Sequence, residues 1–348
     1  MASPNTDLVL YYFPHSFYSQ KVVMYLHEKK IPFRTKLVNI NTGKQFSPEF
    51  LAMSPRGEVP VLVDQNTRTI PDSQKIIDYL EDNFSNGNQK LVPNDPESKT
   101  RCEQLNHQIH ALKVESLTYG SSMFNRMDLG LNPKFPFNTP KARQQMQDIV
   151  THRVAVLRSQ IKLYPQYAGV LNQKIAEIEE NMALIRNRDK YESLLLQFEK
   201  VLDECEAELS THEDQNWWLV SCKITIADIS LAILLHRLWQ LGFEFRMWER
   251  SRPTLAFYYK RIQRNSSFQK AISMSTEFNL SEFLRSPMGV GAVGFIAITA
   301  IALGGYYIWK NVDSSRFGFL NLFGVGKKRV PPHLKDIRFT EARQRYIP

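Results

Sequence analysis

"YYFPHSFYSQKVVMYLHEKK", residues 11–30, begins as an apolar and aromatic stretch and changes to helical spacing after Pro14. The run "LVLYYF", residues 8–13, has the composition of a strand that is buried on both faces. After Pro14, apolar residues recur at helical steps. Ser16 lies where the strand gives way to the helix, so its hydroxyl is placed either to cap that helix or to contact a ligand.

The next segments complete a small α/β pattern. "RTKLVNI" (34–40) and "VPVLVD" (59–64) have strand composition, and "DQNTRT" (64–69) predicts a turn. "PDSQKIIDYLEDNF" (71–84) then places its apolar residues on one helical face. A βαβ unit followed by a hairpin and a helix is the thioredoxin-like order, and we expect this α/β domain to span residues 7–88.

Residues 95–275 predict an all-α domain. Within "SCKITIADISLAILLHRLWQLGF" (221–243), Thr225 and Asp228 have the spacing of a capping box. The helical part holds an insertion at about residues 130–195, which begins in the proline-broken, loop-like stretch "LGLNPKFPFNTPKARQQ". The charged segment 170–209 has apolar residues at helical steps. It is either a solvated helical hairpin that extends the core or a docking face for a partner.

Composition limits the remaining possibilities. The 348-residue chain is 43% apolar, which suits two folded domains plus an additional segment. Its three cysteines, Cys102, Cys205 and Cys222, form no CxxC pattern, so we expect free thiols and a reducing compartment. No metal-ligand spacing is present, and we expect no metal.

The basic charge is concentrated near the C-terminus. The net charge is +9, but from Arg285 onward ten Lys and Arg oppose three acidic residues. The rest of the chain holds 34 basic and 32 acidic side chains and is almost neutral. A nucleic-acid-binding domain should carry a basic face, so we expect no nucleic-acid partner.

Residues 288–309, "MGVGAVGFIAITAIALGGYYIW", contain no charged side chain. As a helix, 22 residues rise about 33 Å, enough to cross a membrane. Tyr306, Tyr307 and Trp309 lie at one end, as interface anchors do. We therefore predict one transmembrane tail anchor, with the bulk of the protein in the cytosol and a basic tail at 310–348. No cleavable targeting signal is visible, and a modest span followed by basic residues is typical of mitochondrial outer-membrane anchors.

The first hundred residues resemble the N-terminal domain of glutathione transferases. The resemblance lies in "FPHSFYSQKV", "GEVPVLVD" and "DSQKIIDYLE". It implies a cis peptide bond at Val59–Pro60, whose backbone pairs with a peptide ligand. It also implies that Asp72 and Ser73 hold the γ-glutamyl end of glutathione, and that Ser16 stabilises the glutathione thiolate. The same positions have a purely structural reading, with Asp72 as a helix N-cap and Ser16 as a turn hydroxyl.

One part of the expected glutathione site departs from this pattern. Active members present Lys or His to the glycine carboxylate, whereas this chain has Arg56-Gly57-Glu58 and Lys44-Gln45 in the corresponding segments. At close range Glu58 would repel a carboxylate by about 1 kcal/mol in water and by more if desolvated. Lys44 or Arg56 are the candidates to compensate. The glutathione site is therefore expected to be degraded.

The serine-type thioredoxin-like domain, the inserted helices and the anchor together resemble the ganglioside-induced differentiation-associated protein 1 family, over residues 7 to about 310. This resemblance implies a mitochondrial outer-membrane protein that faces the cytosol. It also implies roles in mitochondrial fission and network dynamics, in oxidative stress and glutathione balance, and in the peripheral nervous system.

Three functions follow as hypotheses. The first is a glutathione transferase-like regulator of mitochondrial dynamics and redox state with weak or no transferase activity. The second is a membrane-bound transferase that uses Ser16 on apolar electrophiles, and the third is an organelle or cytoskeleton tether. Glutathione is the expected ligand or substrate, and no cofactor is required. The partners considered are a second copy of the chain and, through the inserted helices, cytoskeletal or mitochondrial-dynamics proteins. The sequence leaves a peroxisomal location open.

Overall fold

A computed structural model of the chain describes residues 7–64, 68–84, 90–212 and 217–285. The chain divides into two compact units, Met1–Ser281 and Glu282–Pro348, and the first contains the sheet and most of the helices. The expected membrane span 288–309 and the basic tail 310–348 lie outside the described residues. Within the described residues, no helix is both long and apolar enough to cross a membrane.

The N-terminal domain is built on a sheet of four strands in the order β2-β1-β3-β4. β1 runs parallel to β2 and antiparallel to β3, and β3 runs antiparallel to β4. This is the thioredoxin-like arrangement that the sequence predicted. The strands are β1 (Leu8–Tyr12), β2 (Arg34–Leu37), β3 (Val61–Asp64) and β4 (Arg68–Pro71).

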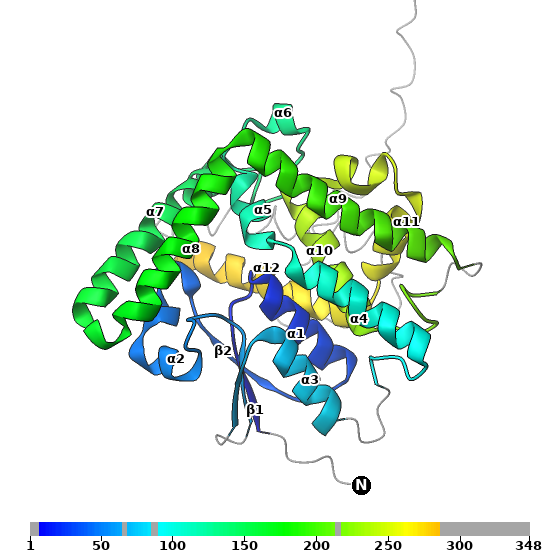
Figure 1. The fold of residues 1–348 in the computed structure, drawn as a ribbon, viewed down its shortest axis with the longest axis horizontal. Coiled ribbons are helices and arrows are strands. Elements are labelled where there is room, and N and C mark those ends of the chain that lie inside the picture. The colour runs from blue at the N-terminus through cyan, green and yellow to red at the C-terminus, as the bar shows by residue number, and fades with distance from the viewer. Residues whose placement is uncertain (1–6, 65–67, 85–89, 213–216, 286–348) are drawn as a thin grey trace, which may run out of the picture. The chain divides into compact units, whose positions relative to one another are not determined.

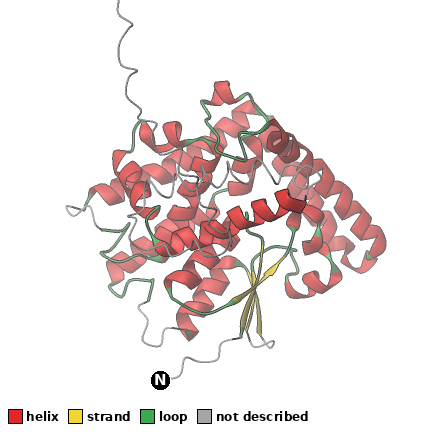
Figure 2. Ribbon diagram, turned by 180° about the vertical axis from the view of Figure 1, so that it is seen from behind, coloured by secondary structure: helices red, strands yellow, loops and turns green. Residues whose placement is uncertain are grey.

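Most of the remaining described residues are helical, as Figure 2 shows. The N-terminal domain contains α1 (Phe17–Glu28), α2 (Pro48–Met53) and α3 (Ser73–Asn83), with short 3-10 turns at Ile40–Thr42 and Lys44–Phe46. The helical domain contains α4 (Pro96–Ala111), α5 (Val114–Gly120), α6 (Arg126–Leu129), α7 (Pro140–Leu163), α8 (Ala168–Arg186), α9 (Arg188–Ser210), α10 (Ile226–Leu241), a π-helical turn (Phe245–Glu249), α11 (Pro253–Ile262) and α12 (Ser266–Arg285).

Side chains alternate along β1 between a buried and a half-buried face of the sheet. Leu8 and Leu10 are fully buried in the core that also holds α1 and α3. Phe13 and Val61 belong to a smaller apolar cluster on the other face. There Phe278 of α12 packs edge-on against the Phe13 ring at 5.4 Å between centroids. The prediction of a strand buried on both faces therefore holds in part: Leu8 and Leu10 are fully buried, whereas Val9 and Tyr11 on the other face are half-buried.

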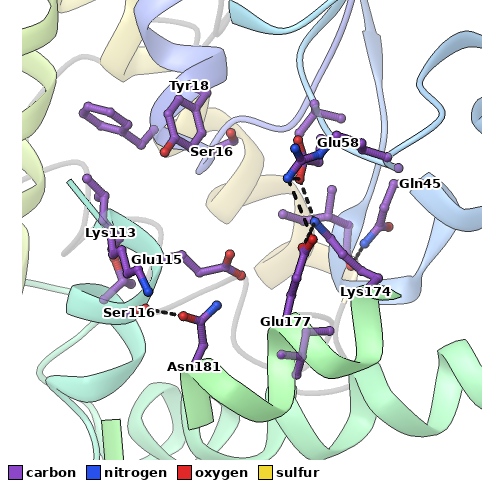
Figure 3. A pocket seen from close by; sticks show the side chains of 18 of the residues that line it. Ser16, Tyr18, Gln45, Glu58, Lys113, Glu115, Ser116, Lys174, Glu177 and Asn181 are labelled. Carbon is purple, nitrogen blue, oxygen red and sulfur yellow. Dashed lines mark hydrogen bonds and ion pairs between the residues drawn. The ribbon is translucent and has the colours of Figure 1, made fainter. Parts of the chain in front are cut away.

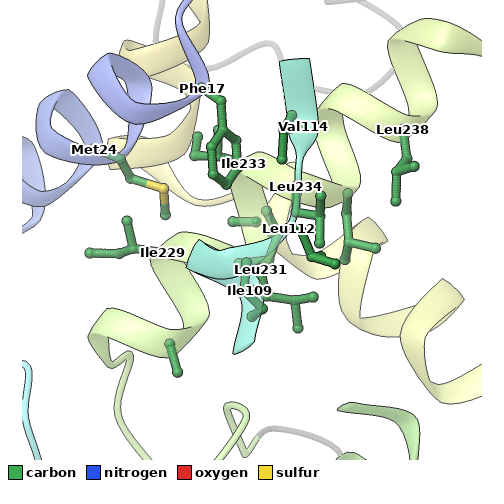
Figure 4. Close-up of a cluster of buried hydrophobic side chains, with 14 of the residues drawn as sticks. Phe17, Met24, Ile109, Leu112, Val114, Ile229, Leu231, Ile233, Leu234 and Leu238 are labelled. Carbon is green, nitrogen blue, oxygen red and sulfur yellow. The ribbon is translucent and has the colours of Figure 1, made fainter. Parts of the chain in front are cut away.

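The core continues from the N-terminal domain into the helical domain. Figure 4 shows Phe17 and Met24 of α1 beside Ile229 and Ile233 of α10. α10 begins with the predicted capping box, in which the Thr225 side chain accepts the Asp228 N–H and the Asp228 carboxylate accepts the Thr225 N–H. The buried start of α10 is therefore fixed against α1, and this contact positions one domain on the other.

The inserted region contains an antiparallel pair of long helices, α7 and α8, which lie side by side in Figure 1. α7 begins inside the stretch that was expected to be loop-like. Pro140 occupies the first turn of the helix, where its missing N–H costs nothing, and the Thr139 side chain caps the helix by accepting the Ala142 N–H. Proline there starts the helix instead of breaking it.

Candidate functional site

A cavity of about 590 Å³ lies between the N-terminal domain and helices α5, α7, α8 and α10. Its volume is in the range that accommodates a drug-sized ligand. All five residues that the resemblance assigned to a glutathione-like ligand line this cavity: Ser16, Val59, Pro60, Asp72 and Ser73. The Val59–Pro60 peptide bond is cis, as expected. The fold therefore brings together residues that are far apart in the sequence.

Ser16 is the N-cap of α1. Its hydroxyl oxygen accepts the Ser19 N–H at 3.3 Å. Because the oxygen acts as acceptor in this contact, the hydroxyl proton remains available to a ligand. The N-terminus of a helix also favours negative charge. Ser16 therefore combines its structural role with the capacity to donate a hydrogen bond to a thiolate.

Tyr18 contributes a second hydroxyl group to the cavity, on the same side as Ser16 in Figure 3. Burial, reinforced by the negative charges of Glu115 and Glu58, raises the pKa of Tyr18 to about 12. The phenol is therefore neutral at physiological pH and is a hydrogen-bond donor. No sequence signal marked Tyr18, because the sequence of an apolar helix does not show which way an aromatic side chain points.

Asp72 and Ser73 begin α3 at the cavity. Asp72 has a left-handed φ of 78°, and its carboxylate accepts the N–H groups of Gln74 and Lys75 at 2.8 and 3.1 Å. The N-cap reading of Asp72 is thus correct. The Ser73 hydroxyl is buried and has no hydrogen-bond partner among the described residues. A strained backbone and an unsatisfied hydroxyl each cost about 1–3 kcal/mol, and both are typical of a site that awaits a ligand.

Glu58 is neutralised by a side chain that the sequence analysis did not consider. Lys174, on α8, places its ammonium 2.6 Å from the Glu58 carboxylate and 3.1 Å from that of Glu177. Arg56 lies 3.3 Å from Glu58. Burial lowers the pKa of Lys174, but the two carboxylates outweigh burial and raise the pKa above its ordinary value. The expected compensation by Arg56 is therefore confirmed, and Lys174 adds a second cation that no sequence motif marked.

The α7–α8 hairpin reaches the cavity because it packs on the N-terminal domain. Leu157 of α7 and Leu171 and Ile175 of α8 form a buried cluster with Phe46 and Leu51. This contact places α8 along the cavity, where Figure 3 shows Lys174 and Glu177 facing Glu58. The reading of segment 170–209 as helices that extend the core is confirmed, because the apolar residues of α8 and α9 are buried. The further place of α8 in the cavity wall was not anticipated.

Two buried guanidinium groups line the cavity as well. Arg153 of α7 is paired with Glu115 and lies over the Tyr119 ring at 5.3 Å. Arg237 of α10 donates a hydrogen bond to the His15 carbonyl at 2.6 Å. No motif in the sequence marked either arginine, since each comes from a helix whose approach to the cavity depends on tertiary packing.

The cysteines lie away from the cavity. The three cysteines are free, as predicted, with Cys102 and Cys205 buried and Cys222 exposed, and none lines the cavity. Burial raises the pKa of the Cys102 thiol to about 11. In the part of the chain that the structure describes, no group of three or more His, Cys, Asp and Glu is arranged to hold a metal ion.

Comparison with known proteins agrees with this geometry. The sequence matches the glutathione S-transferase N-terminal domain over residues 15–83 and the C-terminal domain over residues 158–265. Ganglioside-induced differentiation-associated protein 1-like 1 of Homo sapiens is 28% identical over 284 residues, which cover 77% of this chain and 74% of that protein. These similarities confirm the resemblance predicted from the motifs.

Two solved structures illustrate the fold. The beta-etherase LigF from Sphingobium sp. strain SYK-6 has a TM-score of 0.54 at 18% identity, with 77% of this chain and 99% of that chain covered. Ure2p in complex with glutathione has a TM-score of 0.52 at 16% identity, with 78% and 100% covered. At such identities the structures establish the shared fold alone.

Proposed function

The chain belongs to the glutathione S-transferase family, and from that premise we propose that it is a glutathione-binding protein anchored in the mitochondrial outer membrane. The observation that supports glutathione binding most directly is the meeting of Ser16, Val59, Pro60, Asp72 and Ser73 on one cavity. Each has the chemistry for one part of the tripeptide. Glutathione lies along the cis-proline segment, with its γ-glutamyl end at Asp72 and Ser73 and its thiol at Ser16.

Lys174 completes the proposed site at the glycine end of the tripeptide. A ligand carboxylate beside Glu58 meets the Lys174 ammonium, which Glu58 already holds in place at 2.6 Å. Charge-assisted hydrogen bonds of this kind are about twice as strong as neutral ones. The inserted helices therefore act on the same ligand as the N-terminal domain.

The proposal also includes a location in the mitochondrial outer membrane and a cellular role. The uncharged stretch 288–309 and the basic tail 310–348 support a tail anchor. The resemblance to the ganglioside-induced differentiation-associated protein 1 family supports the mitochondrial outer membrane, with regulation of network dynamics and glutathione balance. Organelle fractionation tests the address: the chain without residues 285–348 should move to the cytosol, and its persistence on mitochondrial membranes would contradict the anchor.

A second candidate is an active transferase, which the Ser16 hydroxyl favours. Its free donor at a helix N-terminus can lower the pKa of the glutathione thiol by hydrogen bonding to the thiolate. In our first proposal the protein binds glutathione as a sensor and turns over slowly or not at all. Conjugation assays with apolar electrophiles separate the two, because only the transferase shows saturable turnover that depends on Ser16.

We also propose that the chain forms a homodimer. Proteins with the glutathione S-transferase fold commonly form homodimers. Light scattering of the full-length protein would show a mass of two chains, whereas a single-chain mass at all concentrations would oppose it.

A further inference from the structure

Arg237 lines the cavity and has no acidic partner. The residue is 7% exposed. Its two terminal nitrogens donate to the His15 carbonyl at 2.6 Å and to the Thr118 hydroxyl at 3.2 Å, while its Nε has no partner. Over the described residues, no Asp or Glu forms an ion pair with it. Burial lowers the pKa of Arg237 to about 10, so the guanidinium still carries its charge at neutral pH.

An unpaired buried cation is costly. The penalty for removing an ion from water is several kcal/mol, and proteins normally offset it with a carboxylate. Other buried arginines in this chain follow that rule: Arg252 pairs with Asp203 at 2.8 Å, and Arg153 pairs with Glu115. Lys21 is another buried cation without such a pair, but it does not line the cavity. Arg237 is thus a charged group at a ligand cavity for which the described residues provide no counter-ion.

The position of Arg237 indicates which part of a ligand it meets. Its partner His15 directly precedes Ser16, so the guanidinium lies at the end of the cavity where the glutathione thiol is proposed to lie. The γ-glutamyl and glycine carboxylates already have partners at Ser73 and Lys174. The anion that faces Arg237 therefore belongs to a second ligand, next to the sulfur.

The surroundings of this end of the cavity suit a polar second ligand. Lys113 adds positive charge, and Ser116 and Asn181, hydrogen-bonded to each other at 3.2 Å, add neutral polar groups. Figure 3 shows Lys113, Ser116 and Asn181 across the cavity from Glu58. Glu115 carries the opposite charge but is engaged by Arg153. A purely apolar electrophile would leave these groups without partners.

We propose that Arg237 binds a carboxylate on the second ligand, so that the protein selects small organic acids, or glutathione conjugates of them, over neutral apolar compounds. This inference rests on the proposed binding of glutathione, because the glutathione sulfur defines the position of the second ligand. It changes the substrate class from apolar electrophiles to acidic ones. Arg237 is the specificity-determining residue.

The test compares two matched glutathione conjugates on the full-length protein. S-butylglutathione carries a neutral chain, and S-(carboxypropyl)glutathione carries the same chain with a carboxylate in place of the terminal methyl group. Calorimetry should show that the wild-type protein binds the acidic conjugate about 10- to 100-fold more tightly, as expected for a hydrogen bond to a charged group. Equal affinity for the two conjugates would overturn the inference while leaving glutathione binding intact.

Substitutions then assign the preference to one side chain. Arg237→Gln, which removes the charge but keeps a polar side chain, should abolish the preference with little change in affinity for S-butylglutathione. Arg237→Lys should retain part of it, and the exposed Arg264→Gln should leave it unchanged. If Arg237→Gln weakens both conjugates equally, Arg237 is a structural or thiolate-binding group and the inference is wrong. If the wild-type protein binds neither conjugate nor glutathione, the proposed function itself fails.

Discussion

The ammonium of Lys174 lies 2.6 Å from the carboxylate of Glu58, although 116 positions separate the two residues in the sequence. The contact joins the inserted helix α8 to the segment that leads into the cis Val59–Pro60 bond. It neutralises the one charge that argued against glutathione. An insertion that looked peripheral in the sequence thereby becomes part of the ligand site.

We predict that Lys174→Ala weakens glutathione binding by about tenfold. The variant removes a cation from the glycine end of the site and leaves Glu58 to repel the ligand, and a hydrogen bond to a charged group contributes about 1.5–3 kcal/mol. Calorimetric titration of the full-length protein measures the change. Glu58→Gln should have the opposite effect and strengthen binding.

Two comparisons assign this effect to the glycine carboxylate. Lys162→Ala removes an exposed lysine of α7 that does not line the cavity, and it should bind glutathione as the wild type does. Glutathione esterified at its glycine carboxylate should bind Lys174→Ala and wild type alike. If the Lys174→Ala substitution weakens binding of the ester as much as it weakens binding of glutathione, then Lys174 affects the cavity as a whole. Its assignment to the glycine carboxylate would then be wrong.

Ser16→Ala should raise the pKa of the bound glutathione thiol by about one unit, because one hydrogen bond to the thiolate is worth about 1.4 kcal/mol. The ultraviolet absorbance of the thiolate, followed against pH, measures this value. If the protein is a transferase, turnover should also fall about 10²- to 10⁴-fold. Ser16→Thr keeps the hydroxyl and should preserve both quantities. An unchanged thiol pKa in Ser16→Ala would mean that Ser16 only caps its helix.

Asp72 and Asp95 provide a matched test of backbone strain. Both are helix N-caps, but Asp72 has a φ of 78° and Asp95 has a φ of −73°. Asp95→Gly should lower the free energy of unfolding by only about a few tenths of a kcal/mol, because glycine is itself a tolerated N-cap. Asp72→Gly should cost about 1 kcal/mol less and so stabilise the protein, because glycine relieves the left-handed strain. Equal losses in urea unfolding would show that Asp72 is unstrained.

Lys21 predicts a pH dependence of stability. It is fully buried on α1, and burial, partly opposed by Asp72, lowers its pKa to about 8. An unfolded lysine titrates near 10.4. Between about pH 8 and 10.4 the unfolded state binds more protons, so the free energy of unfolding rises with pH. Below pH 8 both states are protonated, and the folded protein carries the full penalty of about 3 kcal/mol.

Lys21→Met should remove that penalty. The variant should gain up to about 3 kcal/mol of stability at pH 7, and the gain should shrink as pH rises from 8 toward 10. Lys75→Met, at an exposed position on α3, serves as the control and should show no such trend. Denaturant unfolding across this pH range measures both. If the stability gained by Lys21→Met does not vary with pH, the charge of buried Lys21 is not the source of the penalty.

Local patterns predicted the architecture, because the signals involved are short in range. The strand order follows from local changes between strand, helix and turn patterns around Ser16 and Pro60. The capping box is just as local, since Thr225 and Asp228 are three positions apart. Lys174 and Arg237 gave no such signal, since their roles depend on how α8 and α10 pack. The apolar face of the hairpin was visible in the sequence, but its partner Phe46 was not. The membrane span stays a prediction, because it lies outside the described residues.

Titration of glutathione into the full-length protein, with Ser73→Ala alongside, tests the central claim most directly. The account predicts saturable binding at millimolar ligand or below. Ser73→Ala should weaken that binding about tenfold, because it removes the buried hydroxyl that is proposed to donate a hydrogen bond to the γ-glutamyl carboxylate. If the wild-type protein gives no saturable heat at millimolar glutathione, or if Ser73→Ala binds as tightly as wild type, the cavity is not a glutathione site of the kind described.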